Sequence, residues 1–150
     1  MHATPVIEEV THMTSEVYSA LIALLPQLST SARLPSLEEA EEIVNSNSTH
    51  LFVAREATTT TIVGALTLAI FRIPTGMRAW IEDVVVDESQ RGKGIGSALC
   101  QTAISYAAAA GARTVDLTSR ASREAAHQLY ISVGFQVRDT SVFRYSSPQK

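Results

Sequence analysis

The sequence predicts one α/β domain of the mixed α+β class, in which a mostly antiparallel sheet contains one parallel strand pair and carries helices on both faces. Three successive strand-like segments between residues 50 and 87 are joined by short turns, and this order favours antiparallel hairpins. A strand, a glycine-rich turn, a helix and another strand follow between residues 84 and 118, which predicts a parallel pair. At 150 residues the chain suits a single domain over residues 1–150, with a core over about 6–145.

The first half of the chain is expected to form one strand and two helices ahead of the hairpins. Apolar residues at helical spacing predict the first helix, and Pro26 is expected to end it because proline lacks a backbone N–H group. Ser36 and Glu39 have the spacing of a capping box, which predicts the start of the second helix. The expected elements are a strand over residues 5–10, a helix over 14–25, a loop over 28–35 and a helix over 36–44.

The second half carries most of the predicted sheet. Val84-Val85-Val86 is a run of β-branched residues, which favours a central strand buried on both faces. Gly111 and Gly134 each follow a helical pattern, where glycine commonly terminates a helix. The expected elements are strands over residues 50–55, 60–73 and 79–87, a helix over 95–110, a strand over 113–118, a helix over 122–133, and short strands over 135–137 and 141–145.

Composition and charge exclude several classes of function. A net charge of −3 argues against a general nucleic-acid binder, and the longest apolar stretch, residues 61–71, is too short to cross a membrane. The first ten residues include Glu8 and Glu9 and do not resemble a secretory signal, so a cytoplasmic protein is expected. Cys100 lies in an apolar helical pattern and is expected to be buried and unreactive. The four histidines show no metal-ligand spacing, so no metal is expected.

A glycine-rich turn over Arg91–Ser97 joins the central strand to a helix. Backbone N–H groups at a helix start, glycines that let the backbone close around an anion, and two cationic side chains together suit a pyrophosphate. A Walker loop is excluded because Lys93 is followed by Gly94 instead of Ser or Thr. A dinucleotide fingerprint is excluded because its third glycine is missing.

The spacing Arg91-x-x-Gly94-x-Gly96 resembles the acetyl-CoA pyrophosphate loop of the GCN5-related N-acetyltransferase family. A second segment, Ala126–Phe135, resembles that family's last helix and the strand after it, with a tyrosine four residues before Gly-Phe. The chain departs from the family at Arg123, where an asparagine often helps to hold the pantetheine arm or nearby backbone. Ser119 or Ser122 could supply that contact.

The resemblance implies a GNAT-like domain in which the parallel strand pair splays apart to admit acetyl-CoA. It implies direct transfer of the acetyl group to a primary amine of a small molecule or peptide, and a possible homodimer. Residues 80–87 are also similar to the corresponding strand of glucosamine-phosphate acetyltransferases. The residues expected to bind acetyl-CoA are Val84, Val85, Val86, Arg91, Gly92, Lys93, Gly94, Ile95, Gly96, Ser97 and Ser119.

Two residues are candidates for proton transfer. Tyr130 is expected to be the general acid for the leaving thiolate, the alternative being a tyrosine that only packs in the core. Glu82 is the preferred base, directly or through a water, because strand alternation turns Asp83 to the opposite face; either carboxylate could instead be merely solvated at a strand end. A different class of function, a non-catalytic sensor that binds acyl-CoA, would keep the loop and lose this acid and base.

Overall fold

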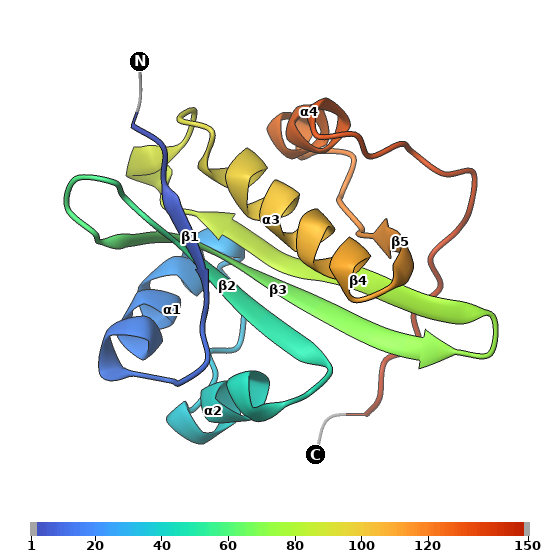
Figure 1. Cartoon of the computed structure of the whole chain (residues 1–150), viewed down its shortest axis with the longest axis horizontal. Coiled ribbons are helices and arrows are strands. Elements are labelled where there is room, and N and C mark those ends of the chain that lie inside the picture. Colours follow the sequence, from blue (N-terminus) through green and yellow to red (C-terminus); the bar gives the residue numbers. More distant parts are fainter. Residues whose placement is uncertain (1–2, 149–150) are drawn as a thin grey trace.

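A computed structural model describes residues 3–148, so the first and last two residues of the predicted 1–150 domain lie outside the described residues. The elements follow the predicted order as far as the last helix (Figure 1). They are β1 (Val6–Glu9), α1 (Ser15–Leu28), α2 (Leu37–Asn45), β2 (Thr49–Arg55), β3 (Ile62–Ile73), β4 (Gly76–Val86), the 3-10 turn η1 (Glu88–Gln90), α3 (Ile95–Ala109), β5 (Ala112–Asp116) and α4 (Glu124–Ser132).

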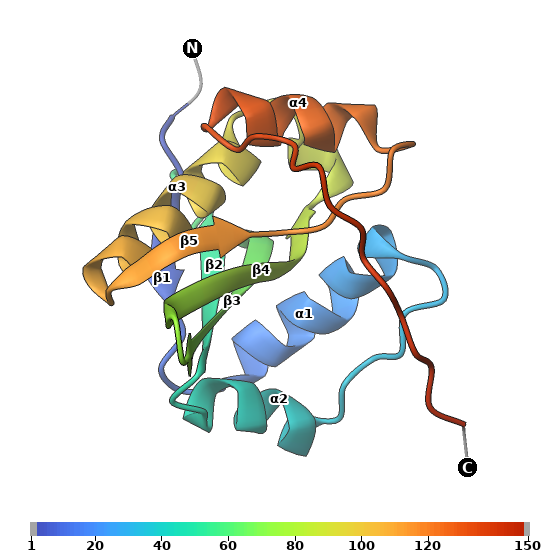
Figure 2. The same ribbon diagram turned by 90° about the vertical axis from the view of Figure 1, so that its right-hand side faces the viewer.

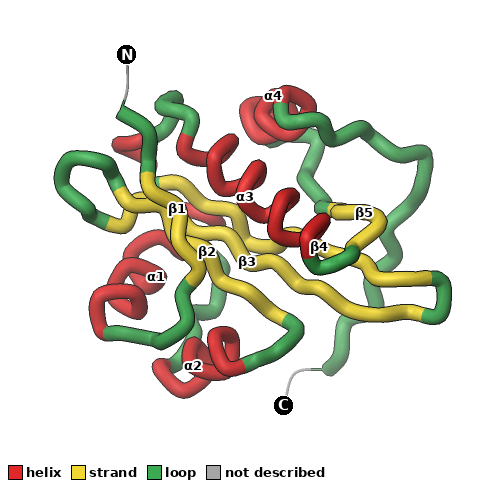
Figure 3. The backbone as a smooth tube through the Cα atoms, viewed as in Figure 1, coloured by secondary structure: helices red, strands yellow, loops and turns green. Residues whose placement is uncertain are grey.

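The five strands form one mixed sheet in the order β1-β2-β3-β4-β5. The first four strands pair antiparallel with their neighbours, and β5 pairs parallel with β4. Figure 3 shows the long β3–β4 hairpin crossing the molecule, with the shorter β1 and β5 at the two edges. The prediction of antiparallel hairpins followed by one parallel pair is therefore confirmed.

Helices cover both faces of the sheet, which also confirms the prediction (Figure 2). One face packs against α3, and its core is centred on Leu66, Leu68 and Leu99, all fully buried. The other face packs against α1 through Leu21 and Leu24. Two apolar layers therefore sandwich the sheet and hold β3 and β4 in place on both sides.

A β-bulge interrupts the regular alternation of β4 at Asp83. This residue has φ +51, and the pairing with β3 shifts register between Ala65 and Thr67. Ile81 packs into the α3-side core whereas Val85, four residues later, packs into the α1-side core. In a regular strand these two side chains would lie on the same face of the sheet. The bulge therefore turns each side chain after Asp83 to the face opposite the one that regular alternation would give it.

The parallel pair is short, because β4 and β5 are hydrogen-bonded only from Met77–Ala112 to Trp80–Asp116. Pairing of β4 with β3 continues to Val86. The last six residues of β4 therefore have a neighbour on one side only, and the sheet opens between the carboxyl ends of β4 and β5. This opening is the splayed strand pair that the sequence predicts.

Two predictions at the first helices have opposite outcomes. The capping box of α2 is confirmed: Ser36 Oγ accepts from the Glu39 N–H at 3.1 Å, and Glu39 Oε1 accepts from the Ser36 N–H at 3.1 Å. The predicted end of α1 at Pro26 is wrong, since the helix continues to Leu28. A proline in the last turn removes one internal hydrogen bond but leaves the following residues free to stay helical.

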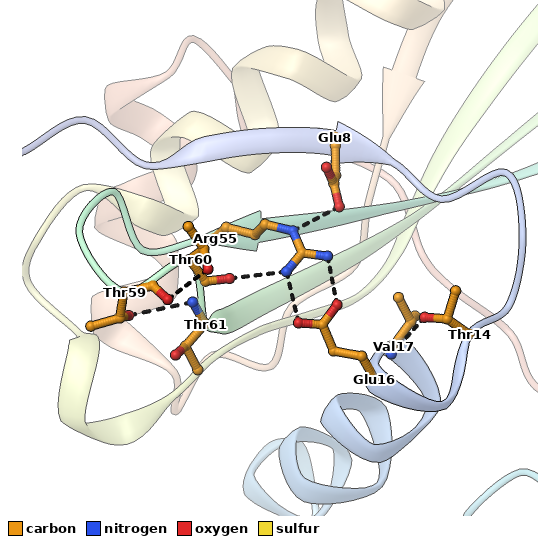
Figure 4. A network of polar contacts seen from close by, with 8 residues as sticks. All are labelled: Glu8, Thr14, Glu16, Val17, Arg55, Thr59, Thr60 and Thr61. Atoms are coloured by element: carbon orange, nitrogen blue, oxygen red, sulfur yellow. Dashed lines mark hydrogen bonds and ion pairs between the residues drawn. The ribbon is translucent and has the colours of Figure 1, made fainter.

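One guanidinium ties three N-terminal elements together (Figure 4). Arg55 at the end of β2 donates to Glu8 on β1 at 2.8 Å, to both carboxylate oxygens of Glu16 on α1 at 2.9 Å, and to the Thr60 carbonyl at 2.9 Å. These bonds lower the pKa of the Glu16 carboxyl, mainly through the hydrogen bonds from Arg55. The network fixes the end of the sheet away from the β5 edge.

The prediction of two final strands over residues 135–137 and 141–145 is wrong. After α4 the chain is extended but unpaired, and every residue from 136 to 148 is exposed. A strand requires a neighbour that accepts and donates its backbone hydrogen bonds, and this segment has none within residues 3–148. β5 consequently forms the edge of the sheet.

Candidate active site

The opening between β4 and β5 continues into a cleft of about 740 Å³. Its floor is the end of β4, one wall is the turn and first residues of α3, and the opposite wall is α4. The side chains and backbone that line it are Gln27, Val84, Val85, Val86, Gln90, Arg91, Gly92, Gly94, Ile95, Gly96, Ser97, Ser122, Arg123, Glu124, Ala125, Ala126, Leu129 and Tyr130. Val84 and Val86 are only half-buried because they face this space, so the expectation that all three valines are buried on both faces holds for Val85 alone.

The start of α3 presents a row of free backbone donors to the cleft. Among the described residues, none of the N–H groups of Gly92–Ser97 donates to a protein acceptor, and the first capping bond is Ala98 N–H to the Gly94 carbonyl. The residue preceding the helix, Gly94, offers no side chain to cap it. Free N–H groups and the positive end of a helix dipole are the features that suit an anion.

Three glycines of this turn have different physical roles. Gly92 and Gly94 have φ +78 and +81, a region that side chains other than glycine rarely adopt, and both face open space. Gly96 has an ordinary φ, but a Cβ there would lie 2.6 Å from Leu129 Cδ1 on α4. The first two glycines shape the turn, whereas Gly96 lets α3 and α4 approach closely.

Charged and amide side chains surround the turn without filling it. Arg91 Nε donates to the Val86 carbonyl at 3.3 Å, which places its guanidinium beside the floor of the cleft. Lys93 Nζ donates to Gln90 Oε1 at 3.0 Å and lies outside the lining. Gln27 on α1 accepts from the Glu88 N–H at 2.8 Å and thereby attaches the loop to α1.

Tyr130 projects from α4 into the cleft. Its ring packs edge-on against Phe135, with centroids 5.9 Å apart, and its hydroxyl makes no hydrogen bond within residues 3–148. Burial raises the pKa of the Tyr130 phenol, and the positive charge of Arg123 opposes this shift. The group is therefore neutral at physiological pH and has a proton to donate to an atom in the cleft.

The two acidic residues of β4 lie at the bulge, outside the lining of the cleft. Glu82 is exposed and accepts a hydrogen bond from Trp80 Nε1 at 2.7 Å. Asp83 is also exposed, and its φ of +51 means that simple alternation does not describe which way it faces. Regular alternation, on which the choice of Glu82 over Asp83 depends, does not hold at this bulge.

Most of the predicted cofactor residues come together in the cleft, except Lys93 and the half-buried Ser119. Sequence reasoning named Ser122 and Arg123 only as possible contacts, and both line it. It missed Gln27, because the helix was expected to end at Pro26, and it missed Gln90, Glu124 and Leu129. Only the helical spacing of Leu129 and Ala126 beside Tyr130 could have identified part of that wall.

Other reactive groups lie away from the cleft. Cys100 is fully buried in the α3-side core, and burial raises the pKa of its thiol to about 11. Residues 3–148 contain no group of three or more His, Cys, Asp or Glu arranged to hold a metal ion. Across the same range, no helix combines the length and apolar character needed to cross a membrane.

Comparison with known structures finds the same fold in several acetyltransferases. An aminoglycoside acetyltransferase from an uncultured soil sample, solved with sisomicin, is 21% identical, with 97% of each chain covered and a TM-score of 0.83. A putative acetyltransferase from Agrobacterium tumefaciens is 26% identical, with 95% of this chain and 99% of that chain covered and a TM-score of 0.80. Glucosamine-6-phosphate N-acetyltransferase from Arabidopsis thaliana is 23% identical, with 97% and 100% covered and a TM-score of 0.77.

A search of curated protein sequences finds no relative of this chain. The model of the acetyltransferase (GNAT) family matches residues 15–135, which include both the glycine turn and Tyr130. With the splayed strand pair and the cleft between α3 and α4, that match places this chain in the GNAT family of acetyltransferases.

Proposed function

We propose that this protein is an N-acetyltransferase that moves the acetyl group of acetyl-CoA directly to a primary amine. The observation that carries the proposal is the continuity of three features: free N–H groups at the start of α3, the unpaired edge of β4, and the Tyr130 hydroxyl all face one cleft. The first feature suits a pyrophosphate, the second a carbonyl oxygen, and the third a departing sulfur.

The residues present fit acetyl-CoA in several respects. The N–H groups of Gly92–Ser97 would hold the pyrophosphate, and Arg91 would add a positive charge beside it. The unpaired edge over Val84–Val86 would hold the arm that leads to the thioester, with Ser122 and Arg123 on the opposite wall. Bound acetyl-CoA supplies an activated acetyl group as a thioester.

The chain's own residues would then act on the charges that develop during transfer. A backbone N–H on the unpaired edge of Val84–Val86 stabilises the carbonyl oxygen as it gains negative charge. As the C–N bond forms and the C–S bond breaks, Tyr130 gives its proton to the sulfur, and the second proton that the nitrogen loses on becoming an amide restores the Tyr130 hydroxyl. Glu82, held by Trp80, accepts the proton of the attacking ammonium through a water.

The acceptor is proposed to be a small-molecule or peptide amine that enters near Trp80 and the bulge. Two of the structural neighbours are named for amino-sugar substrates, an aminoglycoside and glucosamine 6-phosphate, so amino sugars are the first acceptors to test. The same proposal includes a cytoplasmic location, no metal, no nucleic acid or membrane partner, and a homodimer.

The direct test is release of CoA thiol from acetyl-CoA in the presence of a panel of amino sugars, polyamines and peptide amines. We expect one class of amine to raise thiol release well above the rate in its absence. Binding of acetyl-CoA without thiol release for any amine would instead support the sensor. A second test is the Glu82→Gln variant, for which we expect unchanged binding of acetyl-CoA and a lower kcat that high pH partly restores, because the amine must then arrive already deprotonated.

A further inference from the structure

Three polar or aromatic side chains of β4 form a row on one face of the sheet. Ala79 and Ile81 pack into the α3-side core, so the alternate residues Arg78, Trp80 and Glu82 point to the opposite face. Arg78 and Glu82 are exposed and Trp80 is half-buried. Figure 1 shows the hairpin end of β3 and β4 extending beyond α1 and α2. The row therefore lies on an open part of this face.

The row has a regular spacing. From Arg78 to Glu82 the pairing of β4 with β3 shows no register shift, because the bulge begins at Asp83. At the rise of a regular strand, the Cα atoms of Arg78 and Glu82 are about 13 Å apart. The indole of Trp80 comes between them, and its Nε1 donates to Glu82 Oε1 at 2.7 Å. A ligand that reaches from one end of the row to the other must be about 10 Å long.

A hollow of about 290 Å³ lies at the Arg78 end of the row. Its lining residues are Thr75, Gly76, Met77, Arg78, Arg113 and Thr114. Arg113 Nη1 donates to the Thr75 carbonyl at 3.4 Å, which orients its guanidinium. Within residues 3–148, neither Arg78 nor Arg113 forms an ion pair with a carboxylate. Two guanidinium groups and two threonine hydroxyls around one hollow suit a phosphate or a carboxylate.

The negative charges on the same face lie farther along the row. Asp116 of β5 pairs in register with Trp80, and Glu82 lies at the end away from the hollow. The ion pairs formed within residues 3–148 do not include one between Asp116 and either arginine. The row thus has a positive end and a negative end. This charge pattern is complementary to a ligand with an ammonium group at one end and an anionic group at the other.

From this arrangement we propose that the acceptor is an amine that also carries an anionic group, a phosphate or a carboxylate, about 10 Å from its nitrogen. The inference rests on the proposed function, in which Glu82 accepts the proton of the attacking ammonium. It adds the second charged group of the acceptor and the residues that select it. Arg78 and Arg113 bind the anionic group, and Trp80 packs against the part of the acceptor between its two charges.

Binding is tested by calorimetry with ω-aminooctyl phosphate, ω-aminooctanoate and the uncharged-tail analogue aminooctanol, at low ionic strength and with saturating CoA. The octyl chain supplies the required separation. We expect at least one anionic amine to bind about tenfold or more tightly than aminooctanol, because only the anionic amines form charge-assisted hydrogen bonds with the arginines. The tighter of the two identifies phosphate or carboxylate. Equal affinity for all three amines would overturn the proposal.

Arg78→Gln should weaken binding of the preferred anionic amine about tenfold and leave aminooctanol unaffected. Arg72→Gln is the matched control, because it removes the same charge from the same hairpin. Arg72 pairs in register with Met77, which packs against the α3-side core, so its side chain lies on the opposite face. Equal losses in the two variants would mean that overall charge explains the preference, and would also overturn the proposal.

Thiol release from acetyl-CoA with the same three amines separates this inference from the proposed function. The anionic amine should have the higher kcat/KM, and Arg78→Gln should remove that advantage mainly through a higher KM. Turnover of aminooctanol as fast as that of the anionic amines would overturn the inference and leave acetyl transfer intact. Selective binding of an anionic amine without thiol release would support the charged ligand and contradict acetyl transfer.

Discussion

Helices α3 and α4 bound the same cleft from opposite sides, but the core holds them very differently. Six residues of α3 are buried, including Leu99 and Cys100, and this helix contacts every strand of the sheet. α4 has no fully buried residue, and its first residues have no side-chain cap. It is positioned mainly by Leu129 over Gly96 and by the packing of Tyr130 on Phe135.

This difference separates two tasks of the site. The α3 wall carries the proposed anion-binding groups on a helix that is anchored in the core, so their arrangement does not depend on a ligand. The α4 wall carries the proposed proton donor on an element with few contacts, so its position is more easily disturbed. Changes on the α3 side should therefore act mainly on binding of acetyl-CoA, and changes on the α4 side mainly on turnover.

The largest effect is expected from Gly94→Asp in the α3 turn. An aspartate there must adopt φ +81 and places a carboxylate at the proposed pyrophosphate site, so the Kd for acetyl-CoA should rise about a hundredfold or more. Gly111→Asp is the matched control, because Gly111 has φ +90 and open space at the far end of α3. Calorimetry should find its Kd unaltered; equal losses in both variants would mean that backbone strain, not the anion site, explains the result.

Next in size is Tyr130→Phe on α4, which removes one hydroxyl and keeps the ring against Phe135. If Tyr130 protonates the departing sulfur, kcat should fall about tenfold to a hundredfold while the Kd for acetyl-CoA stays nearly constant. Tyr106→Phe is the control: its hydroxyl contacts His50, away from the cleft. A Tyr130→Phe enzyme with full kcat would remove this residue from the mechanism.

A smaller effect is expected where the two helices touch, from Gly96→Ala. The new methyl group would lie 2.6 Å from Leu129 Cδ1, so α4 must shift slightly, at a cost of about 1 kcal/mol of stability and a severalfold loss of kcat. Leu129→Val shortens the side chain that the methyl group meets. The double variant should recover part of kcat, and strictly additive losses would show that the contact does not position α4.

The smallest effect on turnover is expected from Cys100→Ala inside α3. The thiol is buried and its pKa is raised to about 11, so direct transfer does not need it. Removing its sulfur leaves a small void in the core, and the free energy of unfolding should drop by about 1 kcal/mol. Kinetics per folded molecule should match the unmodified protein, whereas an acetyl-cysteine isolated after turnover would contradict direct transfer.

Local rules predicted most of this fold from sequence. The capping box at Ser36 and Glu39 and the hairpins of β2, β3 and β4 depend on neighbouring residues and formed as expected. The turn of Gly92–Gly96 could also be predicted, because its shape depends on the glycines within it. Its spacing fixes which N–H groups stay free, and these groups line the cleft.

The features that sequence reasoning missed depend on contacts between distant segments. Pro26 stays within α1, and only the folded structure brings the adjacent Gln27 to the Glu88 N–H, 61 residues away. The directions in which the side chains of Glu82 and Asp83 point depend on how β4 pairs with β3, where the register shifts by one residue. The sequence of β4 alone does not reveal this shift. Residues 135–145 have a strand-like pattern, but they form no strand because no neighbouring strand pairs with them within residues 3–148.

The bulge at Asp83 also constrains how this protein can vary in length. One extra residue in a strand sends every later side chain to the opposite face of the sheet. Deleting residue 83 would therefore turn Val84 from the α3 side of the sheet to the α1 side, and Val85 from the α1 side to the α3 side. The side chains that now line the floor of the cleft would then point away from it. Adding a residue there would have the same consequence. Insertions and deletions tolerated over evolution should therefore fall in the turn at residues 57–60 or in the 29–36 loop, while the spacing from Ile81 to Gly96 stays constant among functional relatives.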